Sequence, residues 1–194
     1  ITTMVSPSVF FNFLKKSGIN FYVGVPDSLL KNFSYYVSKK ISPKKNIISA
    51  NEGSAIAIAS GYNIATGNIP LVYLQNSGLG NAINPLLSLC DSSVYKIPMI
   101  IMIGWRGEPG CFDEPQHIKQ GAIQEKLLEA LEIPYEIIDN QLTNYVPLTD
   151  LILKSKKESR PVAILVKKDT FSKFQSNNVY PKESNLMIRE RVLK

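Results

Sequence analysis

Short apolar runs alternate along the chain with segments whose apolar residues recur every three or four positions. The runs rich in Val, Ile and Leu predict strands, and the helical spacing predicts helices between them. Strands that alternate with helices in this way form βαβ units, so the pattern predicts an α/β fold. We expect a six-stranded, mostly parallel sheet with helices on both faces. The predicted strands are residues 21–25, 47–48, 71–75, 99–103, 135–138 and 162–166.

The starts of two helices can be predicted from their capping residues. Ser6 and Pro7 suit the N-cap and the first position of the first helix. The second helix is expected to follow Asp27 or Ser28 directly, with one of them as its cap. The face of the first helix predicted to be buried is Val9, Phe10, Phe13 and Leu14.

Polar residues follow four of the predicted strands. The carboxyl ends of parallel strands meet at one edge of a sheet, and ligands bind at that edge. We therefore expect these four groups to converge on one functional site. The groups are residues 27–28, 51–52, 76–81 and 104–120.

Glu52 lies where a strand gives way to a helix. The β-branched residues Ile47 and Ile48 predict a buried strand, and the small residues from Gly53 onward recur at helical spacing. An acid in the first turn of a helix complements the helix dipole, which is the structural explanation for this glutamate. Its place at the predicted ligand edge offers a catalytic alternative.

The segment 104–120 is rich in Gly, Pro and charged residues and is expected to be an irregular loop. It contains His117, the only histidine, which is either a functional group or ordinary polar surface. Arg106 in the same segment is either a clamp for an anionic substrate or a surface arginine.

Gly78 and Gly80 suggest the start of a dinucleotide-binding fingerprint, but the third glycine of that motif would fall at Ile83. A tight turn that exposes the backbone is the better interpretation. No nucleophile elbow, zinc-protease motif or phosphate-loop lysine motif is present in the sequence.

Composition narrows the class of protein further. The 194 residues suffice for one α/β domain, and no apolar run approaches the length of a membrane span. The net charge is +6, but no basic stretch is interleaved with aromatic residues, so we expect neither nucleic acid nor membrane as a partner. Cys90 and Cys111 lack metal-ligand spacing and are expected to be free thiols in a cytoplasmic protein.

Five segments together carry a family resemblance. The chain resembles the pyrimidine-binding (PYR) domain of thiamine-diphosphate-dependent decarboxylases, and within them it is most similar to phosphonopyruvate decarboxylases. Sulfopyruvate decarboxylases are the nearest alternative. The segments are FYVGVPDSLL from Phe21, ANEGSA from Ala50, QNSGLGN from Gln75, GWRGEPG from Gly104 and HIKQG from His117.

The resemblance implies roles for individual residues. Glu52 matches the glutamate that shares a proton with N1′ of the cofactor's aminopyrimidine. Asp27 or Ser28 supplies a polar group near the reacting carbon, with Asp27 as the catalytic candidate. Gln75, Asn76 and Asn81 are expected at the pyrimidine end of the cofactor. The residues expected to face the substrate are Ser28, Arg106, His117 and Gln120.

The resemblance also implies an activity. It is the decarboxylation of a 2-oxo acid, here phosphonopyruvate to phosphonoacetaldehyde and carbon dioxide in phosphonate biosynthesis. The alternatives are a sulfopyruvate decarboxylase subunit and a non-catalytic dimerisation module that kept the fold.

Family members hold magnesium and the cofactor's diphosphate with a Gly-Asp-Gly…Asn motif in a second domain, and this chain has no Gly-Asp pair. We therefore expect residues 1–167 to form the PYR domain, 168–185 a linker and 186–194 the start of a second domain. The resemblance implies an active site shared with the pyrophosphate domain of a second subunit, in a homodimer or larger assembly.

Overall fold

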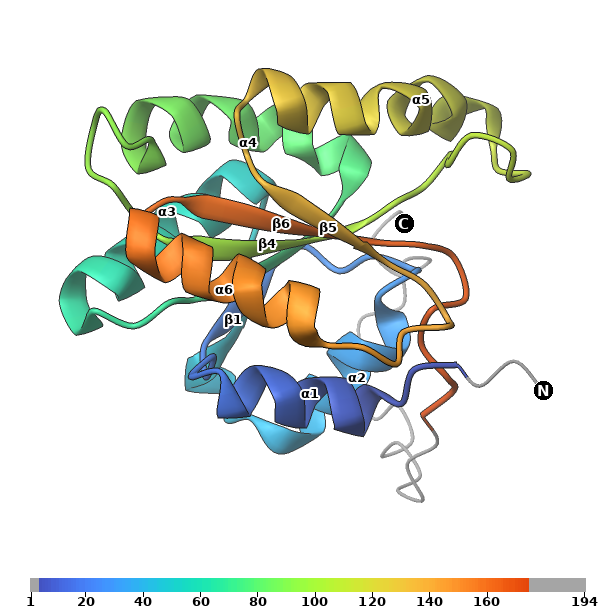
Figure 1. Ribbon diagram of the computed structural model, residues 1–194, viewed down its shortest axis with the longest axis horizontal. Coiled ribbons are helices and arrows are strands. Elements are labelled where there is room, and N and C mark those ends of the chain that lie inside the picture. Colours follow the sequence, from blue (N-terminus) through green and yellow to red (C-terminus); the bar gives the residue numbers. More distant parts are fainter. Residues whose placement is uncertain (1–3, 175–194) are drawn as a thin grey trace, which may run out of the picture.

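The computed structural model describes residues 4–174 and contains one six-stranded sheet (Figure 1). The strands run in the order β2-β1-β3-β4-β6-β5, and every neighbouring pair is parallel. The α/β prediction is confirmed, with a sheet that is wholly parallel. The strands are β1 (Tyr22–Gly24), β2 (Asn46–Ile48), β3 (Leu71–Gln75), β4 (Met99–Gly104), β5 (Tyr135–Ile138) and β6 (Pro161–Val166).

Helices cover both faces of the sheet, and each face has its own apolar core (Figure 1). Side chains of a strand point alternately to the two faces. In β3, Leu71 and Tyr73 therefore enter one core, and Val72 and Leu74 enter the other. The first core is covered by α1 (Pro7–Lys16), α2 (Lys31–Lys40) and α6 (Val146–Glu158), and the second by α3 (Glu52–Thr66), α4 (Leu79–Pro85) and α5 (Pro115–Ala130).

Shorter helical turns complete the connections. A 3-10 turn, Pro43–Lys45, precedes β2, and another, Asn76–Gly78, joins β3 to α4. A π-helical segment, Leu86–Cys90, follows α4. Cys90 and Cys111 are both free thiols, as predicted. Within residues 4–174, none of the helices has the length and apolar character needed to cross a membrane.

Three aromatic rings tie the segment after β6 to the domain. Phe171 is buried, and its ring centroid lies 5.3 Å from that of Phe10 and 5.4 Å from that of Phe33. Val5 forms an isolated parallel bridge with Phe171. The first residues of the segment expected to be a linker, up to Phe174, thus lie on the domain. The rest of that linker and the expected start of a second domain lie outside the described residues.

Two predictions about burial are wrong. Val9 is 53% exposed, and Phe11 takes its place among the buried residues of α1, which are Pro7, Phe10, Phe11 and Leu14. The strand before Glu52 is also less buried than expected, since Ile48 is 70% exposed. The reason is topological: β2 is an edge strand that pairs only with β1, and two β-branched residues do not reveal on which strand the sheet ends.

Two predicted boundaries are also wrong. The helix expected directly after Asp27 or Ser28 begins at Lys31, because the Asp27 carboxylate accepts the N–H groups of a preceding turn instead of capping the helix. The irregular segment expected over 104–120 ends earlier, because α5 starts at Pro115. Proline suits the first turn of a helix. His117 therefore lies in the first turn of α5 rather than in a loop.

Candidate active site

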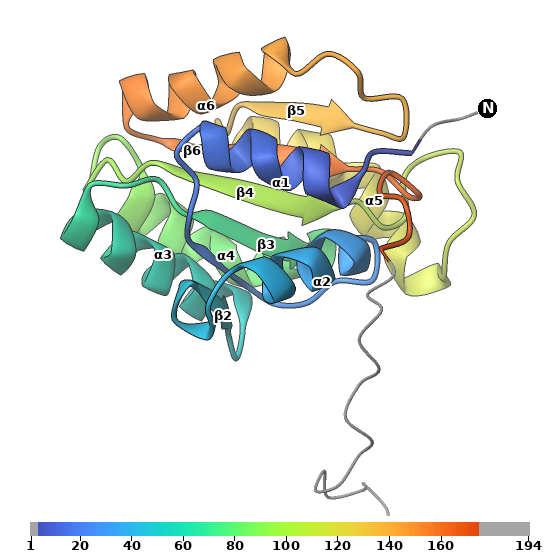
Figure 2. The same ribbon diagram turned by 90° about the horizontal axis from the view of Figure 1, so that it is seen from below.

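The carboxyl ends of the strands meet at one edge, together with the start of α2 and the segment that leads into α5 (Figure 2). The predicted convergence is confirmed by hydrogen bonds that join residues far apart in the chain. Glu52 is bonded to Asn81, and Arg106 is bonded to both Ser28 and Asn76. The polar groups thus form two clusters, one around Glu52 and the other around Arg106.

Glu52 is the first residue of α3 and is half-buried. The side chain of Asn51 caps this helix by accepting the N–H of Ser54 at 2.8 Å, which fixes the backbone at Glu52. Asn81 Nδ2 donates to Glu52 Oε2 at 2.9 Å. Gly78 lies against the Glu52 carboxylate, so closely that a Cβ atom at position 78 would overlap it. The carboxylate is thus oriented by one amide donor and by one glycine.

Asp27 is a buried carboxyl group, only 5% exposed. Its Oδ1 accepts the N–H groups of Leu29 at 2.9 Å and Leu30 at 3.2 Å. Its Oδ2 is buried and has no hydrogen-bond partner among the described residues. Loss of hydration raises the pKa of Asp27 above its ordinary value, although the backbone N–H groups and Arg106 oppose the rise. Such a carboxyl group is suited to hold a proton at the edge of the site.

The Asn76 side chain is fully buried and holds the backbone of Arg106. Asn76 Nδ2 donates to the Arg106 carbonyl at 2.7 Å, and Asn76 Oδ1 accepts the Arg106 N–H at 3.2 Å. Gln75, the preceding residue, donates from Nε2 to Ser77 Oγ at 2.6 Å. The two bonds to Arg106 engage both the nitrogen and the oxygen of the Asn76 amide. Contact of Gln75 and Asn76 with a cofactor stays a prediction.

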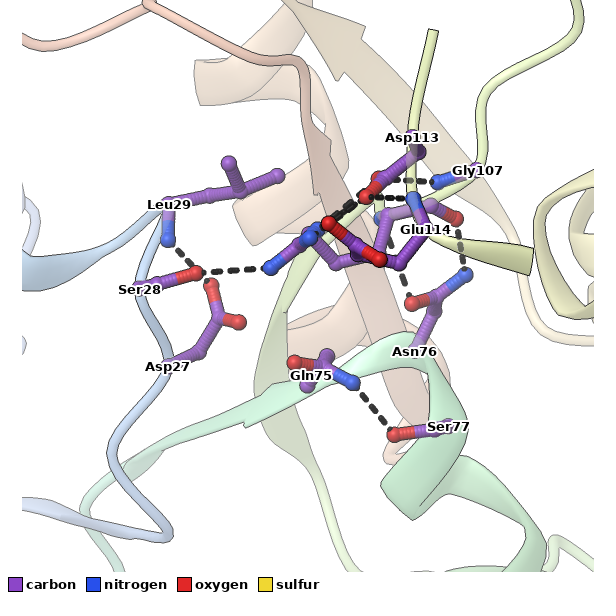
Figure 3. A network of polar contacts seen from close by, with 10 residues as sticks. Asp27, Ser28, Leu29, Gln75, Asn76, Ser77, Gly107, Asp113 and Glu114 are labelled. Carbon is purple, nitrogen blue, oxygen red and sulfur yellow. Dashed lines mark hydrogen bonds and ion pairs between the residues drawn. The ribbon is translucent and has the colours of Figure 1, made fainter. Parts of the chain in front are cut away.

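The Arg106 guanidinium donates hydrogen bonds to both Asp113 and Ser28, two residues that Figure 3 labels. Arg106 Nε donates to Asp113 Oδ2 at 2.8 Å, and Nη2 forms an ion pair with Oδ1 of the same carboxylate. Arg106 Nη1 donates to Ser28 Oγ at 3.0 Å. Asp113 also accepts the N–H groups of Gly107 and Glu114, each at 2.8 Å. The Arg106 guanidinium holds the pKa of Asp113 well below its usual range, so the pair is ionised.

Asp113 was not predicted from the sequence. It is one acid within a segment of mixed charge, and neither spacing nor a neighbouring motif connects it with Arg106 seven residues earlier. Only the fold of this segment reveals the pair. Gly78 was identified as part of a turn, but its contact with Glu52 likewise depends on the tertiary structure.

His117 and Gln120 occupy the first turns of α5 and are half-buried. His117 Nδ1 is buried and has no hydrogen-bond partner within residues 4–174. No hydrogen bond in that part of the chain joins His117 or Gln120 to Glu52 or Arg106. Their predicted contact with substrate stays a prediction.

A metal ion has no ready-made site in the described residues. No group of three or more His, Cys, Asp and Glu side chains comes together there in a form that could hold one. For a thiamine cofactor, the structure offers the Glu52 carboxylate beside Gly78. Within residues 4–174 Glu52 Oε1 has no hydrogen-bond partner, whereas Oε2 is bonded to Asn81.

Comparisons with known proteins agree with the fold and with the resemblance. A family model described as "Thiamine pyrophosphate enzyme, N-terminal TPP binding domain" matches residues 6–130. Phosphonopyruvate decarboxylase of Streptomyces viridochromogenes is 36% identical over 123 residues, which cover 62% of this chain and 30% of that protein. Sulfopyruvate decarboxylase subunit alpha of Methanococcus maripaludis is 35% identical over 150 residues, which cover 77% of this chain and 87% of that subunit.

Solved structures confirm the same architecture. Benzoylformate decarboxylase of Polynucleobacter necessarius superposes with a TM-score of 0.58 at 19% identity, over 91% of this chain and 32% of that one. The matched part also spans only 30% and 33% of two phosphonopyruvate decarboxylases. The likeness thus concerns one domain of these longer proteins. The chain belongs to the thiamine pyrophosphate enzyme family, and residues 6–130 match the N-terminal, cofactor-binding domain of that family.

Proposed function

We propose that this chain supplies the pyrimidine-binding half of the active site of a thiamine-diphosphate-dependent 2-oxo acid decarboxylase. The observation that carries the proposal is the Glu52 carboxylate, which lies at the ligand edge of the sheet between Asn81 and Gly78. Likeness to phosphonopyruvate and sulfopyruvate decarboxylases supports the reaction class. The substrate that we propose is phosphonopyruvate, and the product is phosphonoacetaldehyde for phosphonate biosynthesis.

The residues around Glu52 fit an aminopyrimidine. Glu52 Oε1 lacks a partner in the described part of the chain, so it can share a proton with a ring nitrogen such as N1′. Asn81 holds the other oxygen and fixes the direction of the carboxylate. Since Gly78 has no side chain, the Glu52 carboxylate can lie directly against this turn. When bound, thiamine diphosphate supplies a carbon nucleophile and takes up the electrons left when carbon dioxide departs.

The chain's own residues control protons and orientation. Glu52 would share a proton with the pyrimidine nitrogen of the bound cofactor and so favour the imino tautomer, which can act as a base. Asp27, whose pKa burial raises, can carry a proton to the product side of the reaction. Ser28 and Arg106 face the same edge and can position an anionic substrate.

The other half of the site would come from a partner. We propose that a pyrophosphate-binding domain of a second subunit holds the diphosphate and Mg²⁺, in a homodimer or larger assembly. These 194 residues contain no Gly-Asp pair and so do not themselves supply that motif. The alternative is a separate partner chain, as the name "subunit alpha" indicates for the Methanococcus relative, 87% of which is matched. The substrate would then be sulfopyruvate.

The test is aldehyde formation by the native protein, assayed together with the polypeptide that carries the pyrophosphate-binding domain. Phosphonopyruvate, sulfopyruvate and pyruvate are compared with and without thiamine diphosphate and Mg²⁺. Glu52→Gln should lower turnover by about 10²- to 10⁴-fold, because the amide cannot share the proton. Glu129→Gln makes the same chemical change at an exposed position of α5 and should retain activity.

Two results would contradict the proposal. Turnover of Glu52→Gln close to that of the wild type would remove Glu52 from catalysis. A lack of cofactor-dependent turnover with all three acids would favour a non-catalytic dimerisation module. The ratio of the first two substrates decides between phosphonopyruvate and sulfopyruvate.

A further inference from the structure

We propose that a cavity of about 270 Å³ between the start of α2 and the segments after β4 and β6 binds the terminal oxyanion of the substrate, a phosphonate or a sulfonate. This inference rests on the proposed function and assigns the part of the site that recognises the substrate. The cavity is smaller than the roughly 300–1,000 Å³ of pockets for drug-sized ligands, which suits a small acid. The side chains used in the argument are Ser28, Lys31, Asn32, Arg106, Asp113 and Lys168.

Positive charge from three separate elements meets at this cavity. Lys31 comes from the first turn of α2, Arg106 follows β4 and Lys168 follows β6. Two acids also line the cavity, Asp113 and Asp169, but the Asp113 carboxylate is already paired with Arg106. Three cations against two acids leave one net positive charge, and the cavity is therefore suited to an anion.

The guanidinium of Arg106 keeps donors for a ligand. A guanidinium carries five N–H groups. Asp113 takes those of Nε and one from Nη2, and Ser28 takes one from Nη1. One N–H on Nη1 and one on Nη2 thus have no partner in residues 4–174. Two such groups on one guanidinium match two oxygens of a tetrahedral oxyanion.

Ser28 has a complementary role. Its Oγ accepts the hydrogen bond from Arg106 Nη1, so its own hydroxyl hydrogen can be donated elsewhere. The Ser28 hydroxyl can therefore accept a hydrogen bond from Arg106 and donate one to an oxygen of the ligand at the same time. The Asn32 amide, beside Lys31, donates to the Phe171 carbonyl at 3.3 Å and lines the cavity wall.

Arg106 is held rigidly before any ligand arrives. Asp113 orients its guanidinium and is itself fixed by the N–H groups of Gly107 and Glu114. The Asn76 side chain fixes the Arg106 backbone with two hydrogen bonds, one to its carbonyl and one from its N–H. A preorganised donor loses little conformational entropy on binding, so it contributes more to affinity. We therefore assign Asp113 as a positioning residue that acts through Arg106.

The terminal oxyanion suits this cavity better than the substrate carboxylate does. A fixed cation that held the carboxylate would stabilise the ground state and oppose its departure as neutral carbon dioxide. The phosphonate or sulfonate keeps its charge throughout the reaction. Binding of this group does not oppose the charge change at the reacting carbon, so its binding energy can be used to orient the substrate.

The first readout is direct binding of methylphosphonate and methanesulfonate to the native protein by calorimetry. We expect Arg106→Gln to weaken binding of the preferred anion about 10- to 100-fold, the value of a charged hydrogen bond. Lys168→Met should weaken it severalfold. The matched control is Lys39→Met, which removes the same charge at the far end of α2 and should bind as the wild type does.

The second readout is kcat/KM for phosphonopyruvate or sulfopyruvate divided by kcat/KM for pyruvate, which lacks the terminal phosphonate or sulfonate. Arg106→Gln should lower this ratio about 10- to 100-fold. Asp113→Asn should raise KM for the oxyanion substrate with little change in kcat, whereas damage to folding would lower kcat through loss of active protein.

These two readouts separate the outcomes. A preference for methylphosphonate supports a phosphonate substrate, and a preference for methanesulfonate supports a sulfonate one. Failure of the wild type to bind either anion, or equal binding by Arg106→Gln, would overturn the inference. Anion binding that Arg106→Gln abolishes, in a protein that turns over no 2-oxo acid, would keep the anion site and reject the decarboxylase.

Discussion

At the scale of single residues, the site depends on side chains that are held by very few partners. Asn81 and the missing side chain of Gly78 together define the direction of the Glu52 carboxylate. The backbone of Gly78 has φ −74°, which any residue adopts. Glycine is therefore required at position 78 by space and not by conformation.

Gly78→Ala should displace the Glu52 carboxylate, because the added methyl group would overlap it. Misplacement of a catalytic group by about 1 Å can cost roughly 10²-fold, so we expect a loss of that size in turnover. The control is Gly80→Ala, two residues later in α4, where an added Cβ meets no atom within 4 Å. It should keep full activity and raise the free energy of unfolding by up to about 1 kcal/mol. Equal activity of the two variants would contradict the role of Gly78.

At the scale of elements, the segment between β4 and α5 is an ordered arm rather than a free loop. Glu108 forms an ion pair with Lys167 at 2.6 Å, and Trp105 Nε1 donates to the Gly121 carbonyl at 3.0 Å. Gly107, at φ +69°, lies against the backbone of α5, and Gly121 lies against the Gly107 carbonyl. Two glycines thus allow the arm and the helix to pack backbone to backbone.

Gly121→Ala should separate the arm from α5, because the new Cβ would overlap the Gly107 carbonyl. Overpacking of this kind typically costs about 1–3 kcal/mol, and urea unfolding would measure the loss. The matched variant is Gly61→Ala in α3, where an added Cβ meets nothing within 4 Å. It should be neutral or stabilising. If both variants unfold at the same urea concentration, the close packing of arm and helix does not limit stability.

The elements could be predicted where local signals are complete. Residues 71–75 and 135–138 were predicted as strands and form β3 and β5 with those bounds, since turn residues border the apolar runs on both sides. The exposure of Ile48 was missed, because strand order is a property of the whole sheet. The convergence at the strand ends was predictable from parallel topology. The Arg106–Asp113 pair was not, because it depends on how one irregular segment turns back on itself.

At the scale of the whole molecule, we propose that the chain presents half of a site. Glu52 and the cavity lined by Arg106 lie at the carboxyl edge of the sheet, and the described residues hold no metal-binding cluster. Residues 6–130 match one domain of the family, and some relatives are longer, such as the phosphonopyruvate decarboxylase of which 30% is covered. The proposed division of the site between subunits would make catalysis a property of the assembly, which can be tested by mixing variants.

For the homo-oligomer proposed here, two inactive variants should restore activity when they assemble together. One is Glu52→Gln, and the other replaces the aspartate of the Gly-Asp-Gly motif in the pyrophosphate-binding domain. In a one-to-one mixture of dimers, about one quarter of the sites would combine two intact halves, and activity should recover to that fraction. Each variant expressed alone is the control and should stay inactive. If the mixture stays inactive as well, the two halves of each site come from one polypeptide. Recovery is expected from two arrangements, a homo-oligomer and an assembly with a separate chain, because separate chains would also reassort. Purification of the native complex, followed by a count of its distinct chains, distinguishes these two arrangements.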